Sequence, residues 1–107
     1  MKAKELTINF DGLNEEGLFR LMKDELGFPD FFGMNYDALI DCITEMRQPT
    51  AKMSKVFLDE DEVLILNCKS FLKANLDTNN FLDVIQFMNE REINCCGNTQ
   101  ILLNLIP

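Results

Sequence analysis

The sequence GFPDFFGMNYDALIDCITEM, from Gly27 to Met46, joins an aromatic loop to an acidic helix. Three phenylalanines, one proline and two glycines crowd into its first seven residues, a composition typical of a tight loop. Gly33 permits a positive φ where this loop ends. Because Phe31 and Phe32 are adjacent and cannot readily point the same way, we expect one of them in the core and the other near the surface.

Asn35 is a favoured N-cap residue, and we expect it to begin a helix that runs to about Arg47. At about 100° per residue, Asp37, Asp41 and Glu45 fall within an arc of about 80°. Like charges four residues apart destabilise a helix by a few tenths of a kcal/mol per pair, so this acidic stripe costs stability. The other side of the helix is apolar and is expected to face the core: Ala38, Leu39, Cys42, Ile43 and Met46.

Three segments have the patterns of strands. Leu6, Ile8 and Phe10 alternate with polar residues and predict a strand over residues 4–10. The apolar runs at residues 63–68 and 101–106 are typical of strands that are buried on both faces. Four consecutive acids at residues 59–62 precede the second strand and are interpreted as a solvated connector.

Further helices lie between these strands. Asn14 caps a predicted helix that Gly27 stops, and residues 69–76 are predicted to form a short one. A last helix is expected to run from a cap at Asp77 or Thr78 to about Arg91, with a turn over residues 95–98. The predicted fold class is α/β, a small three-stranded parallel sheet packed by about four helices in the order β-α-α-β-α-α-β. A length of 107 residues fits a single domain over residues 1–107.

The net charge of −8 argues against binding to nucleic acid or to an anionic membrane, because both attract lysine and arginine. The N-terminal sequence has no apolar leader, and no apolar run approaches the roughly 18 residues of a membrane-spanning helix. We therefore expect a cytoplasmic protein. An acidic chain of this kind is either kept soluble by its own charge or binds a basic partner.

Catalysis and metal binding have little support in the residue types. The chain has no histidine, which removes the commonest general base and any mixed Cys/His zinc site. Paired acids on one exposed helix face do not form a catalytic cleft. We expect no enzyme activity, no cofactor and no metal. The four cysteines are predicted to be reduced, buried and inert: Cys42, Cys68, Cys95 and Cys96.

Binding is a better use of the acidic stripe. Carboxylates at phosphate-like spacing can fill the cationic pocket of an enzyme that cuts nucleic acid, through charge-assisted hydrogen bonds to arginine and lysine. Two alternatives stay open at this point. Instead of filling a nuclease pocket, the stripe could be a solvated helix face, or it could belong to an acidic interaction module for a basic partner that is not a nuclease.

Residues 22–44, MKDELGFPDFFGMNYDALIDCIT, resemble the barstar family of ribonuclease inhibitors. The run combines a PxFFG loop, an asparagine helix cap and a DALxD segment. The resemblance implies an intracellular antitoxin or immunity protein that blocks a basic ribonuclease toxin and is a monomer when free. It implies seven partner-binding positions, with Gly33, Leu39 and Ile43 in structural roles: Phe31, Asn35, Asp37, Ile40, Asp41, Thr44 and Glu45.

The chain departs from the family pattern at two of these positions. Family members often have a tyrosine at the position of Phe31, and the family's prototype has a tryptophan at that of Ile40. We expect target specificity to differ at these two positions. The resemblance also offers Met46 as a possible contact, and Asp83 or Glu90 as the acid that the prototype uses on its last helix.

Overall fold

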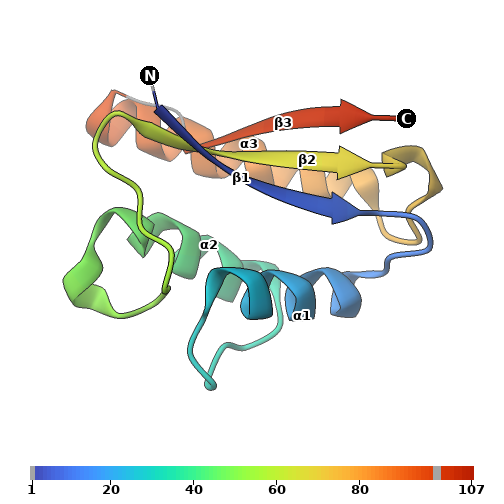
Figure 1. Ribbon diagram of the computed structural model, residues 1–107, viewed down its shortest axis with the longest axis horizontal. Helices are drawn as coiled ribbons and strands as arrows, with labels where there is room; N and C mark the ends of the chain where they lie inside the picture. Colours follow the sequence, from blue (N-terminus) through green and yellow to red (C-terminus); the bar gives the residue numbers. More distant parts are fainter. Residues whose placement is uncertain (1, 98–99) are drawn as a thin grey trace.

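The computed structural model describes residues 2–97 and 100–107, without the side chains of Pro49 and Cys96. Its strands form a three-stranded parallel sheet in the order β1-β2-β3, in which Leu6 pairs with Leu66 and Leu66 with Leu103. This confirms the predicted α/β class and the parallel sheet (Figure 1). The elements in chain order are β1 (Lys2–Asn9), α1 (Glu15–Leu26), α2 (Tyr36–Thr44), η1 (Glu45–Arg47), η2 (Pro49–Ala51), β2 (Glu62–Lys69), η3 (Phe71–Lys73), α3 (Thr78–Cys96) and β3 (Ile101–Ile106), where η denotes a 3-10 turn.

The described residues contain three α-helices, so the prediction of a fourth is wrong. The segment expected to form it, residues 69–76, makes only the single turn η3. Ser70 enters this turn with φ 53 and Ala74 leaves it in an extended conformation. Both ends therefore lie outside the α region, and the helical hydrogen-bond pattern cannot spread beyond the turn.

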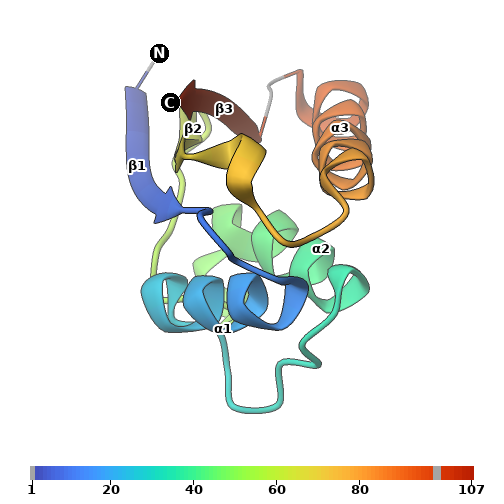
Figure 2. The same ribbon diagram turned by 90° about the vertical axis from the view of Figure 1, so that its right-hand side faces the viewer.

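The helices gather on one side of the sheet and leave its other face uncovered (Figures 1 and 2). On the uncovered face, Asn67 of β2 donates to Glu5 at 3.2 Å and accepts from Asn104 at 2.9 Å. The central strand β2 is nearly all buried, whereas β3 is an edge strand. The prediction that residues 101–106 form a buried strand is therefore wrong, because Leu102 and Leu105 are 44% and 55% exposed.

The core lies between the sheet and the helices. At one end of it, the rings of Phe10, Phe71 and Phe81 contact one another with centroids 5.0–5.9 Å apart. Among the described residues, none of the helices has the length and apolar composition needed to cross a membrane. The fully buried side chains come from the strands and from all three α-helices, and include Ile8, Leu18, Met22, Leu39, Ile43, Leu64, Leu66 and Met88.

The segment from Gln48 to Asp61, here called the connector, is fixed to the helix layer by hydrogen bonds. The backbone N–H of Lys55 donates to the carbonyl of Leu26 at 2.9 Å, and that of Leu58 donates to Met46 at 2.9 Å. The acidic run at residues 59–62 is only partly solvated. Its last residue, Glu62, begins β2, is 7% exposed and accepts a 2.8 Å hydrogen bond from the backbone N–H of Asp59.

Helix α3 is longer than its sequence indicates. Asp77 caps it by accepting from Asn80 N–H at 3.1 Å, and Gly97, with φ 80, ends it five residues beyond the predicted Arg91. Cys95 is thus helical and exposed, not in a turn and not buried, while Cys42 and Cys68 are buried as predicted. Asn98 and the side chain of Cys96 lie outside the described residues.

Candidate functional site: an acidic helix beside an aromatic turn

One side chain, that of Asn35, caps the N-terminus of α2 and connects it to the preceding loop. Asn35 Oδ1 accepts from the Ala38 N–H at 2.7 Å, while its Nδ2 donates to the Gly33 carbonyl at 3.0 Å. We expected a positive φ at Gly33, but in this junction it is Met34 that has one, at 52°, so that expectation is wrong. Gly33 serves a close approach instead, because a Cβ there would lie 3.1 Å from Asn35 Nδ2.

The turn before α2 presents one aromatic ring to solvent. Phe32 N–H donates to the Pro29 carbonyl at 2.9 Å, which places Asp30 and Phe31 at the apex of a β-turn. Phe31 is 76% exposed, whereas Phe28 and Phe32 are about 5% exposed and contact each other with centroids 5.0 Å apart. The expectation that one of the adjacent phenylalanines is buried and the other exposed is confirmed.

Two carboxylates project from α2. Asp37 and Asp41 are both exposed and lie one helical turn apart, about 6 Å along the axis. Behind them, Leu39 and Ile43 are fully buried. The α-helix ends at Thr44, three residues earlier than predicted. Glu45 is therefore not part of α2 but its C-terminal cap, half-buried, with its N–H directed at the carbonyls of Asp41 and Ile43.

The remaining sequence-predicted residues lie around these two acids. Ile40 and Thr44 are half-buried, and Ile40 packs against the core cluster. Met46 is fully buried, so it supports η1 from within and is not available for contact at the surface. The two candidate acids on α3, Asp83 and Glu90, are both exposed. Glu90 lies in the groove between α3 and β3, where it accepts a 3.0 Å hydrogen bond from Gln86.

Cys42 lies on the inner side of α2 and is not a nucleophile. Burial, followed by the nearby carboxylates of Asp41 and Glu45, raises the pKa of its thiol to about 11. The thiol therefore stays protonated at neutral pH, and a protonated thiol is a poor nucleophile. This agrees with the predicted inert role.

A buried polar cluster holds the C-terminal end of α2. Arg47 Nε donates to Gln100 Oε1 at 3.1 Å and lies 3.4 Å from Glu92 Oε2. Gln100 in turn donates from Nε2 to the Ile43 carbonyl at 2.7 Å. The end of α2 is thereby joined to α3 and β3, although α2 has no basic residue of its own in its last turn to neutralise the helix dipole.

Tyr36, the first residue of α2, was not singled out from the sequence. Its ring packs edge-on against Phe19 of α1, with centroids 4.9 Å apart. Its buried hydroxyl has no hydrogen-bond partner among the described residues, and burial, with smaller contributions from Glu15 and Asp77, raises its pKa to about 12. Only the aromatic character at the first position of the helix could have indicated a packing role.

Comparison with protein families gives a match to the family described as Barstar (barnase inhibitor), over residues 3–96. The matched range extends from β1 to the last residue of α3 and includes the whole of α2 and the turn before it. Comparison with the curated proteins gives no match.

Proposed function

Because the chain belongs to the Barstar family, a family of ribonuclease inhibitors and not of enzymes, we propose that it blocks the cationic active site of a ribonuclease toxin. It would do so as an antitoxin or immunity protein inside the cell that makes the toxin. The inhibiting surface is the exposed face of α2 together with the Phe31 turn.

The single observation that carries this proposal is the arrangement of Asp37 and Asp41. Both carboxylates are exposed on a short helix whose opposite side is completely buried. Arginine and lysine side chains that bind phosphate can bind such carboxylates instead, through short charge-assisted hydrogen bonds. Because the helix is fixed by Asn35, Leu39 and Ile43, binding orders few additional groups, which favours affinity.

The neighbouring residues then have separate roles. Phe31 is an exposed aromatic anchor at the tip of a turn, and its large apolar ring suits a pocket beside the ribonuclease active site. Ile40 offers apolar contact, while Asn35, Thr44 and Glu45 supply polar groups around the two aspartates. The net charge of −8 also favours fast encounter with a basic enzyme.

The proposal is tested by co-expression with basic ribonuclease toxins, barnase among them. The wild-type chain should protect cells from one of these toxins, and Asp41→Asn, which keeps the shape and removes one charge, should not. Asp24→Asn is the matched control, because Asp24 is an exposed acid on α1 that the proposal does not place in the inhibiting surface. Protection by Asp41→Asn equal to that of the control would contradict the proposal. Binding to a basic protein that is not a ribonuclease, without protection, would favour the acidic interaction module instead.

A further inference from the structure

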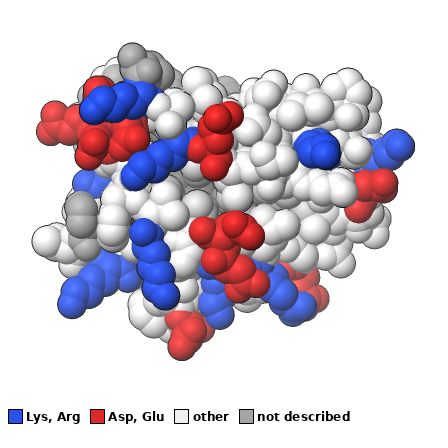
Figure 3. All heavy atoms as spheres, viewed as in Figure 1, with Lys and Arg blue, Asp and Glu red and all other residues white. Residues whose placement is uncertain are grey.

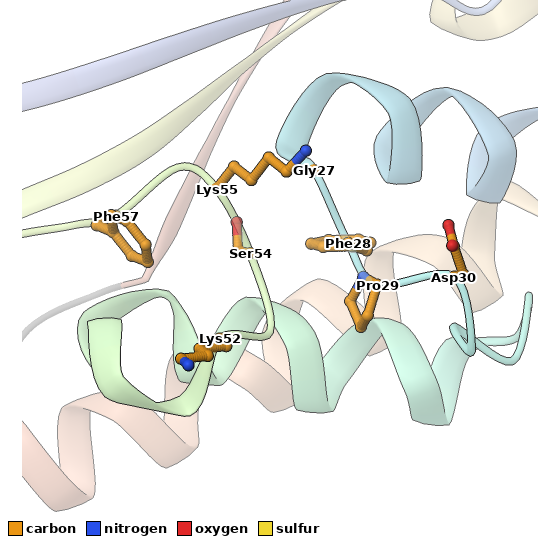
Figure 4. Close-up of a pocket in the computed structure, with 8 residues that line it drawn as sticks. All are labelled: Gly27, Phe28, Pro29, Asp30, Lys52, Ser54, Lys55 and Phe57. Atoms are coloured by element: carbon orange, nitrogen blue, oxygen red, sulfur yellow. The ribbon is translucent and has the colours of Figure 1, made fainter.

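A cavity of about 510 Å³ lies beside the Phe31 turn. Figure 4 shows its two walls facing each other, one from the residues that follow α1 and one from the connector. Asp30, at the rim of the cavity, directly precedes Phe31 in the turn. The cavity is therefore next to the Phe31 turn along the chain. The lining residues are Gly27, Phe28, Pro29 and Asp30 on one wall, and Lys52, Ser54, Lys55 and Phe57 on the other.

The two walls are fixed to each other. Ser54, which is 5% exposed, donates from Oγ to the Leu26 carbonyl at 2.7 Å, and the backbone N–H of Lys55 donates to the same carbonyl at 2.9 Å. The stem of Lys55 also crosses Gly27 so closely that a Cβ there would lie only 2.6 Å from Lys55 Cβ. The cavity is thus formed before any partner binds.

Two lysines on one wall and Asp30 on the other give this cavity a small net positive charge, opposite in sign to that of the rest of the protein. Lys52 and Lys55 are exposed, and in the described part of the chain neither forms an ion pair or a side-chain hydrogen bond. Lys52 also has a φ of 57°, a conformation that residues with a side chain rarely adopt and that is common at functional sites. Figure 3 shows lysine and arginine side chains gathered at the lower left, over the connector.

We propose that this cavity binds an acidic loop of the ribonuclease, with an aspartate or glutamate of the enzyme held by Lys52 and Lys55. The inference rests on the proposed function and extends its surface. Two unpaired ammonium groups complement a carboxylate, and the half-buried ring of Phe57 complements apolar atoms beside it. The cavity volume of about 510 Å³ is larger than a single side chain, so the rest of a loop that carries the acid has room beside it.

The consequence of this second contact is target specificity. The α2 acids would recognise the cationic active site that ribonucleases of this kind share, whereas the lysines require an acidic group at one place on the rim. A ribonuclease with a basic group there is repelled. The two contacts have opposite signs, so they also fix the orientation of the bound enzyme.

The test compares two double variants with the same change in net charge. Lys52→Glu with Lys55→Glu reverses the cavity, while Lys2→Glu with Lys69→Glu reverses two exposed lysines on the sheet. Dissociation constants are measured against the ribonuclease toxin that the wild-type chain neutralises in co-expression. The cavity variant should weaken binding at least about tenfold beyond the control, and raising salt to about 0.5 M should shrink that difference. Thermal unfolding checks that each variant folds. If the cavity variant does not fold, Lys52→Gln with Lys55→Gln replaces it, and this variant should lose about half as much binding affinity on a logarithmic scale.

Each outcome is decisive. Equal dissociation constants for the cavity variant and its control, with the wild type fully inhibitory, overturn the cavity proposal and leave the proposed function standing. A wild-type chain that neutralises none of the toxins removes the proposed function, and the cavity proposal with it. Tight binding of inorganic phosphate to the free protein through Lys52 and Lys55, with unchanged ribonuclease binding, would assign the cavity to a small anion and also overturn the proposal.

Discussion

The side-chain amide of Gln100 donates a 2.7 Å hydrogen bond to the carbonyl oxygen of Ile43, and so joins the start of β3 to the last turn of α2. Gln100 is 1% exposed, and its Oε1 accepts from Arg47 Nε. A helix leaves its last carbonyls without partners inside the helix, and here a residue 57 positions away satisfies one of them. A residue near the C-terminal end of the sequence therefore holds the last turn of α2 in place from its buried side.

We predict that Gln100→Leu lowers the free energy of unfolding by about 1–3 kcal/mol, because it leaves the buried Ile43 carbonyl and the Arg47 side chain without this partner. Urea titration followed by circular dichroism measures the change. Asn104→Leu, on the exposed face of the sheet, is the control and should change the stability by less than about 0.5 kcal/mol. Equal losses for the two variants would show that the buried cluster does not stabilise α2.

Asn35→Ala should have two effects, because Asn35 both caps α2 and contacts the Gly33 carbonyl. The free energy of unfolding should fall by about 1 kcal/mol, the usual loss for an N-cap. Ribonuclease inhibition should also weaken, since the turn that carries Phe31 loses its connection to the helix. Asn14→Ala removes the equivalent cap of α1 and should reduce stability by a similar amount while leaving inhibition unchanged. If both variants inhibit equally well, the cap of α2 has no role in binding.

Phe31 and Phe32 should respond oppositely to replacement by alanine. Phe31 is 76% exposed, so Phe31→Ala should leave the thermal midpoint nearly unchanged and weaken binding to the ribonuclease. Phe32 is buried, so Phe32→Ala should lose about 3–5 kcal/mol of stability. Scanning calorimetry and a ribonuclease titration distinguish the two. A strong loss of stability in Phe31→Ala would show that its ring belongs to the core.

The stability of the protein should fall in strong alkali. Burial raises the pKa values of Cys42 and Cys68 from 9.0 to about 11, and that of Tyr36 from 10.0 to about 12. A group whose pKa is higher in the folded state loses its proton first in the unfolded chain, so its contribution is complete below the unfolded pKa and is lost as the pH rises through the folded one. Stability should therefore decline between about pH 9 and pH 12.

Tyr36→Phe isolates one of these groups. In the part of the chain that the structure describes, its hydroxyl has no hydrogen-bond partner, so its removal should leave stability at neutral pH unchanged or slightly higher. The variant should also lose less stability than the wild type between about pH 10 and pH 12. Denaturant titrations across this pH range provide the measurement. Identical alkaline profiles for the two proteins would mean that the Tyr36 hydroxyl is not desolvated.

The local signals in the sequence predicted the elements that surround the site. Asn14, Asn35 and Asp77 are N-caps, and Gly27 ends α1, because capping depends on residues within three positions of the helix end. The parallel sheet followed from apolar runs linked by helices. The crowding of aromatics in a short loop indicated that one of the adjacent phenylalanines is exposed, and the resemblance to the barstar family pointed to Phe31.

Features that depend on distant partners could not be predicted in the same way. The early end of α2 coincides with Arg47 turning inward to Glu92 and Gln100, which no local pattern contains. Glu62 lies in an acidic run yet is buried, because Asp59 N–H and Lys4 approach it. The exposure of β3 depends on its place at the edge of the sheet, which an apolar sequence does not reveal.

We propose that the carboxylates of Asp37 and Asp41 occupy the phosphate-binding pocket of a ribonuclease. The most direct measurement is competition, in which the dissociation constant for the neutralised ribonuclease is determined with increasing inorganic phosphate. The wild-type chain should be displaced competitively, and Asp37→Asn with Asp41→Asn should bind far more weakly and lose most of its sensitivity to phosphate. Wild-type binding that is indifferent to phosphate, or a double variant that binds as tightly as the wild type, would contradict the claim.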